Sequence, residues 1–232
     1  MSIKENIAAV RQRIAAAARE AGRDPSEITL VGASKMNDAE ACREAVAAGI
    51  DVLGENRVQE MTQKLEQHAY DGVPLHFIGH LQRNKVRQVV GRVALIQSVG
   101  SLELLDAIER QAAQLSLQQD VLLEVNVGDE AAKSGFSPEE LARGAEYALE
   151  LPHINVRGLM CIPPVSDEPH GSIPYFSKLR TLSVDINEKM YHNKLSILSM
   201  GMSGDYEDAI RAGATMVRVG TAIFGTRRYN VP

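Results

Sequence analysis

Ile28-Thr29-Leu30-Val31-Gly32-Ala33-Ser34-Lys35 is a short apolar run that ends on a lysine. Its β-branched residues and polar boundaries predict a strand that is buried on both faces. In a parallel α/β fold the carboxyl ends of the strands face the ligand site, so Lys35 is expected at the mouth of such a site. An amine there has a desolvated stem, and burial can lower the pKa of such an amine, which suits Schiff-base chemistry with an aldehyde. The alternative is an ammonium that simply reaches water, and this strand alone does not decide between the two.

Further short apolar runs follow along the chain, and helical patterns lie between them. Strands are expected over residues 51–54, 75–79, 94–99, 121–127, 155–160, 195–200 and 215–219. Helices are expected over residues 3–22, 38–48, 82–90, 175–190 and 206–212, with others ending near Gln67 and beginning at Ser101 and Ser137. Asp38 should cap its helix and Gly49 should end it.

Strands that alternate with helices in this way are typical of a (β/α)8 TIM barrel, here with one extra amino-terminal helix. The rival fold is an open doubly wound sheet. It is weakened because no Gly-x-Gly-x-x-Gly motif follows the first strand. We therefore expect one α/β barrel domain over residues 1–232.

Composition and charge restrict the class of protein. Hydrophobic residues make up 44% of the chain and the formal net charge is −5, which predicts a globular protein and argues against a general nucleic-acid binder. The two cysteines, Cys42 and Cys161, lie far apart and predict neither a disulfide framework nor a metal site. The charged amino terminus lacks a signal-peptide core, and no apolar run could span a bilayer. We expect a cytoplasmic protein.

Polar clusters at other predicted strand ends could join Lys35 at the mouth of the barrel. Gly54-Glu55-Asn56 ends the second strand, although a turn with Asn56 as a helix cap is an equal alternative. In this fold the loops after strands seven and eight commonly hold a phosphate with backbone N–H groups and hydroxyls. These loops contain residues of the right types, namely Ser203, Gly220 and Thr221.

Arg218 lies within the eighth predicted strand, and alternation places it on the same face as Met216 and Gly220. An unpaired buried guanidinium is very costly, so Arg218 needs a partner. A ring nitrogen or an anion of a ligand would supply one, and an ion pair with Glu124 is the alternative. Glu124 itself and Asn126 are expected to be interior polar residues.

Several short motifs carry a resemblance that spans nearly the whole chain: Ser34-Lys35, Gly54-Glu55-Asn56, Val58-Gln59-Glu60, His76-Phe77-Ile78-Gly79, Leu81-Gln82, Asn84-Lys85, Lys133-Ser134-Gly135, Arg157-Gly158-Leu159-Met160, Gly201-Met202-Ser203 and residues 217–225. In this combination the chain resembles the pyridoxal 5′-phosphate homeostasis protein family, which shares the amino-terminal barrel of alanine racemase. It departs from the family around the lysine. Gly32-Ala33 and Met36-Asn37-Asp38 stand where members more often have Ala-Val and Thr-Lys-Pro.

The resemblance implies that the cofactor is pyridoxal 5′-phosphate (PLP), held as an imine on Lys35. It implies that Arg218 faces the pyridine nitrogen and that Asn56 lies near the cofactor. It also implies that three residues hold the phosphate: Ser203, Gly220 and Thr221. The implied role is in vitamin B6 and amino-acid homeostasis without evident catalysis.

Three functional hypotheses follow from these residues. The first is a carrier or regulator of PLP, because an arginine at the pyridine nitrogen opposes protonation of the ring and weakens it as an electron sink. The second is a small racemase-like enzyme. Racemases tolerate such an arginine, but they take a second base from a carboxyl-terminal domain of a partner subunit, and this chain stops at Pro232. The third is a cofactor-free Schiff-base lyase with His76 as its base, although a lone strand histidine is usually a satisfied core residue.

The expected partners follow from the first hypothesis. They are PLP itself and the PLP-dependent apoenzymes that would receive it. We expect no nucleic-acid or membrane partner, no metal, and a monomeric chain. The role of His80 is not assigned.

Overall fold

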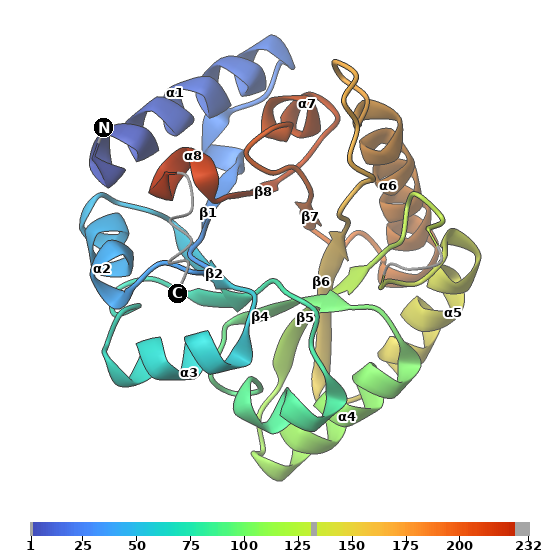
Figure 1. Ribbon diagram of the computed structural model, residues 1–232. Coiled ribbons are helices and arrows are strands. Elements are labelled where there is room, and N and C mark those ends of the chain that lie inside the picture. Colours follow the sequence, from blue (N-terminus) through green and yellow to red (C-terminus); the bar gives the residue numbers. More distant parts are fainter. Residues whose placement is uncertain (1, 131–133, 226–232) are drawn as a thin grey trace.

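The computed structural model describes residues 2–130 and 134–225, in which eight parallel strands close into one barrel (Figure 1). Each strand pairs with the next along the chain, and β8 pairs with β1 to complete the ring. The expected TIM barrel is thus confirmed. The strands are β1 (Thr29–Ala33), β2 (Val52–Glu55), β3 (Leu75–Phe77), β4 (Leu95–Val99), β5 (Gln119–Glu124), β6 (Ile154–Met160), β7 (Ile197–Ser199) and β8 (Met216–Val219). Lys133, one of the motif residues, lies outside the described residues.

Helices surround this ring, and the extra amino-terminal helix α1 packs beside α7 and α8 (Figure 1). The α-helices are α1 (Ile3–Glu20), α2 (Ala39–Ala47), α3 (Val58–Glu66), α4 (Leu102–Gln114), α5 (Pro138–Leu149), α6 (Ile173–Ile186), α7 (Tyr206–Arg211) and α8 (Thr221–Phe224). The predicted caps are present: the Asp38 side chain accepts from Ala41 N–H, and Ser137 and Glu140 form a capping box on α5. Within the described part of the chain, no helix has the length and apolarity that crossing a bilayer requires.

Two helical segments differ from the sequence expectation. The segment predicted as a helix over 82–90 is the 3-10 helix η2 (Arg83–Gln88), whose N-cap, Gln82, makes no side-chain capping bond. The predicted segment also contains three β-branched residues of low helix propensity, Val86, Val89 and Val90. The helix α6 ends early, and a π-helical turn, η3 (Asn187–Tyr191), follows it. The Asn187 side chain bonds both the N–H and the C=O of Leu195, so it competes with the helical pattern there.

The barrel interior has an apolar layer and, above it, a polar one. The apolar layer consists of six buried residues from different strands: Val31, Val52, Leu95, Leu122, Met160 and Met216. Gln97, Ser199 and Arg218 lie two residues beyond inward-facing apolar residues of β4, β7 and β8, so they share the inner face. They therefore form a buried polar layer nearer the carboxyl ends of the strands. The larger core lies between the strands and the helices.

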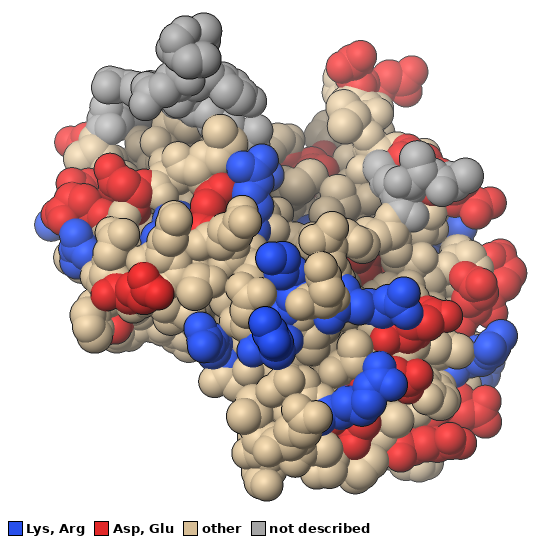
Figure 2. All heavy atoms as spheres, turned by 60° about the horizontal axis from the view of Figure 1, so that its bottom comes forward, with Lys and Arg blue, Asp and Glu red and all other residues tan. Residues whose placement is uncertain are grey.

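The surface carries charges of both signs. On the face drawn in Figure 2, basic side chains form a short band across the middle and acidic side chains lie on both sides of it. This mixed pattern agrees with the small negative net charge of −5.

Candidate functional site

A cavity of about 570 Å³ opens at the carboxyl ends of β1 and β8. Its walls come from the segment after β1, the first turn of α2, the loop after β7, and the short helix α8. The cavity brings together five of the six predicted site residues: Lys35, Ser203, Arg218, Gly220 and Thr221. Asn56 is not among the described residues that line it. In this fold the carboxyl end of the barrel is where ligands bind.

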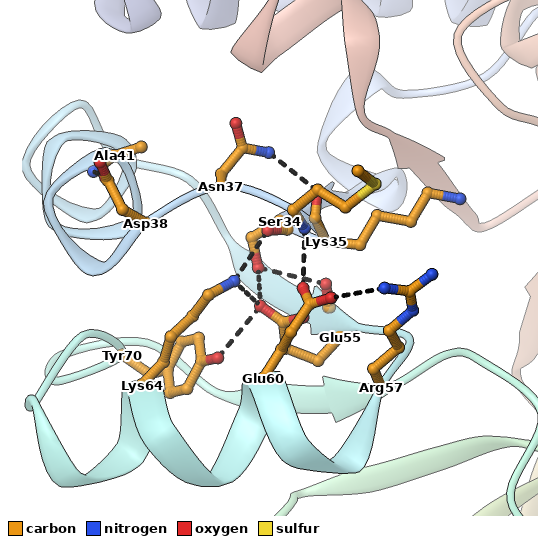
Figure 3. Close-up of polar contacts among 12 residues, drawn as sticks. Ser34, Lys35, Asn37, Asp38, Ala41, Glu55, Arg57, Glu60, Lys64 and Tyr70 are labelled. Carbon is orange, nitrogen blue, oxygen red and sulfur yellow. Dashed lines mark hydrogen bonds and ion pairs between the residues drawn. The ribbon is translucent and has the colours of Figure 1, made fainter. Parts of the chain in front are cut away.

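Lys35 lies in a tight turn directly after β1. The Asn37 N–H donates to the Ser34 carbonyl over 3.1 Å, and the Asn37 side chain donates to the Lys35 carbonyl over 3.1 Å. Met36 has a φ of 62°, in the left-handed region that is uncommon for a side-chain-bearing residue. Figure 3 shows the Lys35 side chain directed away from Glu55 and Lys64, and it is one of the residues that line the cavity.

Arg218 is a buried cation on the inner face of β8, only 4% exposed. Its Nη1 donates to Ser199 Oγ over 2.5 Å and its Nη2 donates to the Cys161 carbonyl over 2.8 Å. The alternative of an ion pair with Glu124 is wrong, because no carboxylate oxygen of the described residues lies within ion-pairing distance. Burial lowers the pKa of Arg218, and the nearby Cys161, Glu124 and Asp205 oppose that shift. A buried guanidinium that lines a cavity without a carboxylate partner suits a ligand atom with a lone pair.

Glu124 takes a different partner. Its carboxylate oxygens accept hydrogen bonds from Ser134 Oγ over 3.1 and 3.2 Å. Burial raises the pKa of Glu124, and the bond from Ser134 and the charge of Arg218 reduce that rise. Glu124 is therefore an interior polar residue, as the sequence predicted.

A hydrogen-bonded chain runs beneath Arg218 through the barrel interior. Ser199 Oγ donates to Gln97 Oε1 over 2.7 Å, and Gln97 Nε2 lies 2.9 Å from His76 Nδ1. Burial lowers the pKa of His76 to about 4, so the ring is neutral at neutral pH and its Nδ1 accepts from the Gln97 amide. His76 is not among the described residues that line the cavity. It fits the interpretation as a satisfied core histidine, and its position does not favour a role as the base of a lyase.

The Ser203 hydroxyl is hydrogen-bonded to two backbone N–H groups at the start of α8. Its Oγ accepts from the N–H of Gly220 over 3.2 Å and from that of Ala222 over 3.4 Å. The turn that presents Ser203 requires Gly201, which has a φ of 92° and packs so closely that a Cβ would lie 2.6 Å from Ala209 Cβ. A hydroxyl that accepts two N–H bonds still has its own proton to donate. The Gly220 and Ala222 amides are engaged by Ser203 Oγ, so the hydroxyl proton is the group that is placed to donate to an anion.

Asn56 lies just after β2, and its Oδ1 is buried with no hydrogen-bond partner among the described residues. A buried oxygen without a donor costs free energy, so the position suits a donor brought by a ligand or a water. Gly79, after β3, packs against the Asn56 main chain. A Cβ at Gly79 would lie 2.2 Å from the Asn56 carbonyl oxygen.

Sequence reasoning missed a buried charged cluster beside Lys35 (Figure 3). Lys64 Nζ lies 2.6 Å from Glu55 Oε1, which also accepts from Ser34 Oγ over 2.6 Å and from Tyr70 Oη over 3.1 Å. Burial raises the pKa of Tyr70, so its hydroxyl stays protonated and donates. The available signal was helical spacing, because Lys64 falls on the same face of α3 as the buried Val58 and Met61.

The described residues contain no group of three or more His, Cys, Asp or Glu side chains that could hold a metal ion. Cys42 and Cys161 are both buried and free of disulfides. The residues that line the cavity offer an amine from Lys35, a guanidinium from Arg218, and the hydroxyls of Ser203 and Thr221.

Comparison with known proteins identifies the family. The family model described as "Alanine racemase, N-terminal domain" matches residues 3–228. The pyridoxal phosphate homeostasis protein of Aquifex aeolicus is 46% identical over 99% of this chain and 100% of that protein. The chain belongs to the pyridoxal phosphate homeostasis protein family. The family member of Pseudomonas aeruginosa is 43% identical over 100% of this chain and 98% of its own length.

Solved structures share the fold of this chain. PipY of Synechococcus elongatus, solved with PLP bound, superposes with a TM-score of 0.84 at 32% identity and covers 97% of this chain and 100% of PipY. Alanine racemase of Clostridium difficile in complex with cycloserine gives a TM-score of 0.73 at 16% identity, over 95% of this chain and 60% of that one. The racemase likeness shows a shared barrel fold.

Proposed function

We propose that this protein binds PLP reversibly through Lys35 and serves in intracellular PLP and amino-acid homeostasis, holding the cofactor without turning over a substrate. One observation carries the proposal. A single cavity joins the Lys35 side chain, the buried Arg218 guanidinium and the Ser203 hydroxyl beside backbone amides, in a chain whose relatives are named for PLP homeostasis. The PLP bound to PipY supports the choice of ligand.

Each residue has a proposed role that its chemistry suits. When bound, PLP supplies an aldehyde carbon that forms an imine with an amine, and a ring that can withdraw electrons. Lys35 provides the amine, and Arg218 donates a hydrogen bond to the ring nitrogen. Asn56 is proposed to lie near the cofactor, and its Oδ1, which has no partner among the described residues, would accept from a donor there. Three residues are proposed to bind the phosphate: Ser203, Gly220 and Thr221.

Arg218 also supports the absence of turnover in this proposal. A guanidinium has only donors at all ordinary pH values, so it cannot accept a hydrogen bond from a protonated ring nitrogen, and its charge opposes the positive charge that ring protonation would create. Carbanion chemistry on the cofactor depends on a strongly withdrawing ring. The same arginine is fixed by Ser199 and the Cys161 carbonyl, so it keeps its position.

Incubation with L-alanine in deuterated water tests whether the protein is a carrier or an enzyme. We expect the rate of exchange at the α-carbon, followed by NMR, to match that of free PLP at the same concentration. Enzymes typically turn over at about 1–10³ per second. An exchange rate in that range with the holoprotein would contradict the carrier function and favour a racemase-like enzyme.

Removing the proposed phosphate contacts should weaken binding of the phosphorylated cofactor selectively. Loss of a hydrogen bond to a charged group costs about 1.5–3 kcal/mol, so Ser203→Ala and Thr221→Val should each weaken PLP binding roughly tenfold to a hundredfold. Binding of unphosphorylated pyridoxal, measured in the same titration, should barely change. Equal weakening for both ligands would mean that these residues shape the cavity and do not bind the phosphate.

The proposal extends to partners and location. We propose that PLP-dependent apoenzymes receive the cofactor and that the protein acts as a cytoplasmic monomer. The cavity opens at the mouth of the barrel, which leaves a route for release. The two buried free cysteines suit a reducing compartment.

A further inference from the structure

The helix α3 contacts the main chain on both sides of Lys35 (Figure 3). On the amino-terminal side, Lys64 Nζ donates to the Ser34 carbonyl over 2.9 Å. On the carboxyl-terminal side, the Met36 N–H donates to Glu60 Oε2 over 2.7 Å. Lys64 and Glu60 are four residues apart, one turn of α3, so a single helix face meets the turn that carries Lys35.

The Lys64 contact is anchored in the interior. Ser34 and Glu55 are fully buried, and the Lys64 side chain is 8% exposed. Ser34 is bonded through its N–H to the Gly54 carbonyl and through its Oγ to Glu55, while its carbonyl accepts from Lys64. The main chain before Lys35 is therefore fixed to β2 and α3 at three points.

The Glu60 contact stabilises an unfavourable backbone conformation at Met36. Met36 is left-handed, and such a residue persists only when its surroundings determine its geometry. The Glu60 carboxylate accepts the Met36 N–H at a short distance, and Arg57 Nη1 lies 3.4 Å from its other oxygen. Charge-assisted bonds of this kind are stronger than neutral ones.

We propose that α3 positions the reactive amine, with Glu60 as the positioning residue and the Lys64–Glu55 pair as its anchor. The inference rests on the proposed function of Lys35. Neither Glu60 nor Lys64 is among the described residues that line the cavity, so both act through the turn at Lys35. Lys64 Nζ itself is directed into the cluster with Glu55 and Ser34 and is not offered to a ligand.

Loss of the Glu60 contact is expected to change the rate of imine formation at Lys35 more than the structure of the cavity. The neutral amine attacks the aldehyde carbon, and the imine forms as the carbonyl oxygen leaves as water. The attack requires a narrow approach geometry, and a misplacement of about 1 Å can cost 10²-fold in rate. Loss of the Glu60 contact frees Met36 to leave the left-handed region, which reorients the Lys35 stem. Contacts to the ring and the phosphate come from other loops and remain in place.

Three variants on α3 test this. Glu60→Ala removes the acceptor for the Met36 N–H, and Glu60→Gln keeps an acceptor oxygen at the same reach. Glu66→Ala makes the same truncation at an exposed residue at the end of α3. Two quantities are measured for each variant: the rate at which the near-visible absorption band appears on mixing with PLP, and the affinity for pyridoxine 5′-phosphate. The latter is an alcohol, so it reports ring and phosphate binding without a covalent step.

We expect Glu60→Ala to slow the appearance of the band by about 10- to 100-fold, with pyridoxine 5′-phosphate affinity within about twofold of wild type. Glu60→Gln should recover most of the rate, and Glu66→Ala should behave as wild type. Wild-type rates in Glu60→Ala would overturn the inference, and so would a parallel loss of both quantities, which marks a general structural role. Absence of the band in the wild-type protein would instead overturn the proposed function, and this inference with it.

Discussion

Lys64→Met should lower the free energy of unfolding by about 3–5 kcal/mol, because it leaves the Glu55 carboxylate buried and unpaired. Glu55 is fully buried and Lys64 supplies its cationic partner over 2.6 Å, while Ser34 and Tyr70 donate only neutral bonds. One oxygen of Glu55, Oε2, already has no partner among the described residues. Urea denaturation measures the loss as a lower midpoint with an unchanged slope.

Two companion variants show whether the unpaired charge is the cause. Adding Glu55→Gln to Lys64→Met removes the charge but keeps an oxygen for Ser34 and Tyr70, so it should restore at least half of the lost free energy. Lys4→Met removes an exposed lysine of α1 and should change the free energy of unfolding by less than about 0.5 kcal/mol. An effect of Lys64→Met no larger than that of Lys4→Met would contradict a structural role for the buried pair.

Gly79→Ala should destabilise the fold by about 3 kcal/mol, at the upper end of what overpacking usually costs. The added Cβ would lie 2.2 Å from the carbonyl oxygen and 2.6 Å from the Cα of Asn56, and a main chain cannot move aside as a side-chain tip does. The shift would fall on Asn56, so we also expect weaker PLP binding. Thermal unfolding and a PLP titration measure the two effects.

Gly204→Ala is the matched control for this substitution. A Cβ at Gly204 meets no atom within 4 Å, and alanine restricts the unfolded chain more than glycine does. The change should therefore be neutral or stabilise by up to about 1 kcal/mol. Similar destabilisation by both alanines would show that the close approach of Gly79 to Asn56 is not what the fold depends on.

The sequence predicted the barrel well because its signals are local. The apolar runs mark the strands, Asp38 and Ser137 cap their helices as expected, and alternation correctly placed Arg218 on the inner face with Met216. The ends of elements were less predictable. The valines after Arg83 and the side chain of Asn187 replace α-helical turns by a 3-10 helix and a π-helical turn.

The partners of polar residues could not be predicted in the same way. Alternation gives the face on which Arg218 lies but not its neighbours, and those proved to be Ser199 and the Cys161 carbonyl, not Glu124. The contacts between α3 and the Lys35 turn join residues that are 24 and 30 positions apart. Helical spacing places Lys64 on the buried face of α3, but nothing in its own segment identifies Ser34 or Glu55 as its partners. Such long-range polar contacts depend on the closed barrel, so they become visible only with it.

Locating the cofactor on the chain tests the central claim most directly. The wild-type protein is incubated with one equivalent of PLP, reduced with borohydride so that the covalent link becomes permanent, and digested for peptide mapping by mass spectrometry. The account predicts that the reduced adduct lies on Lys35, in the peptide that continues into Met36 and Asn37. Recovery of the adduct mainly on Lys64, Lys85 or Lys133, with Lys35 unmodified, would contradict it.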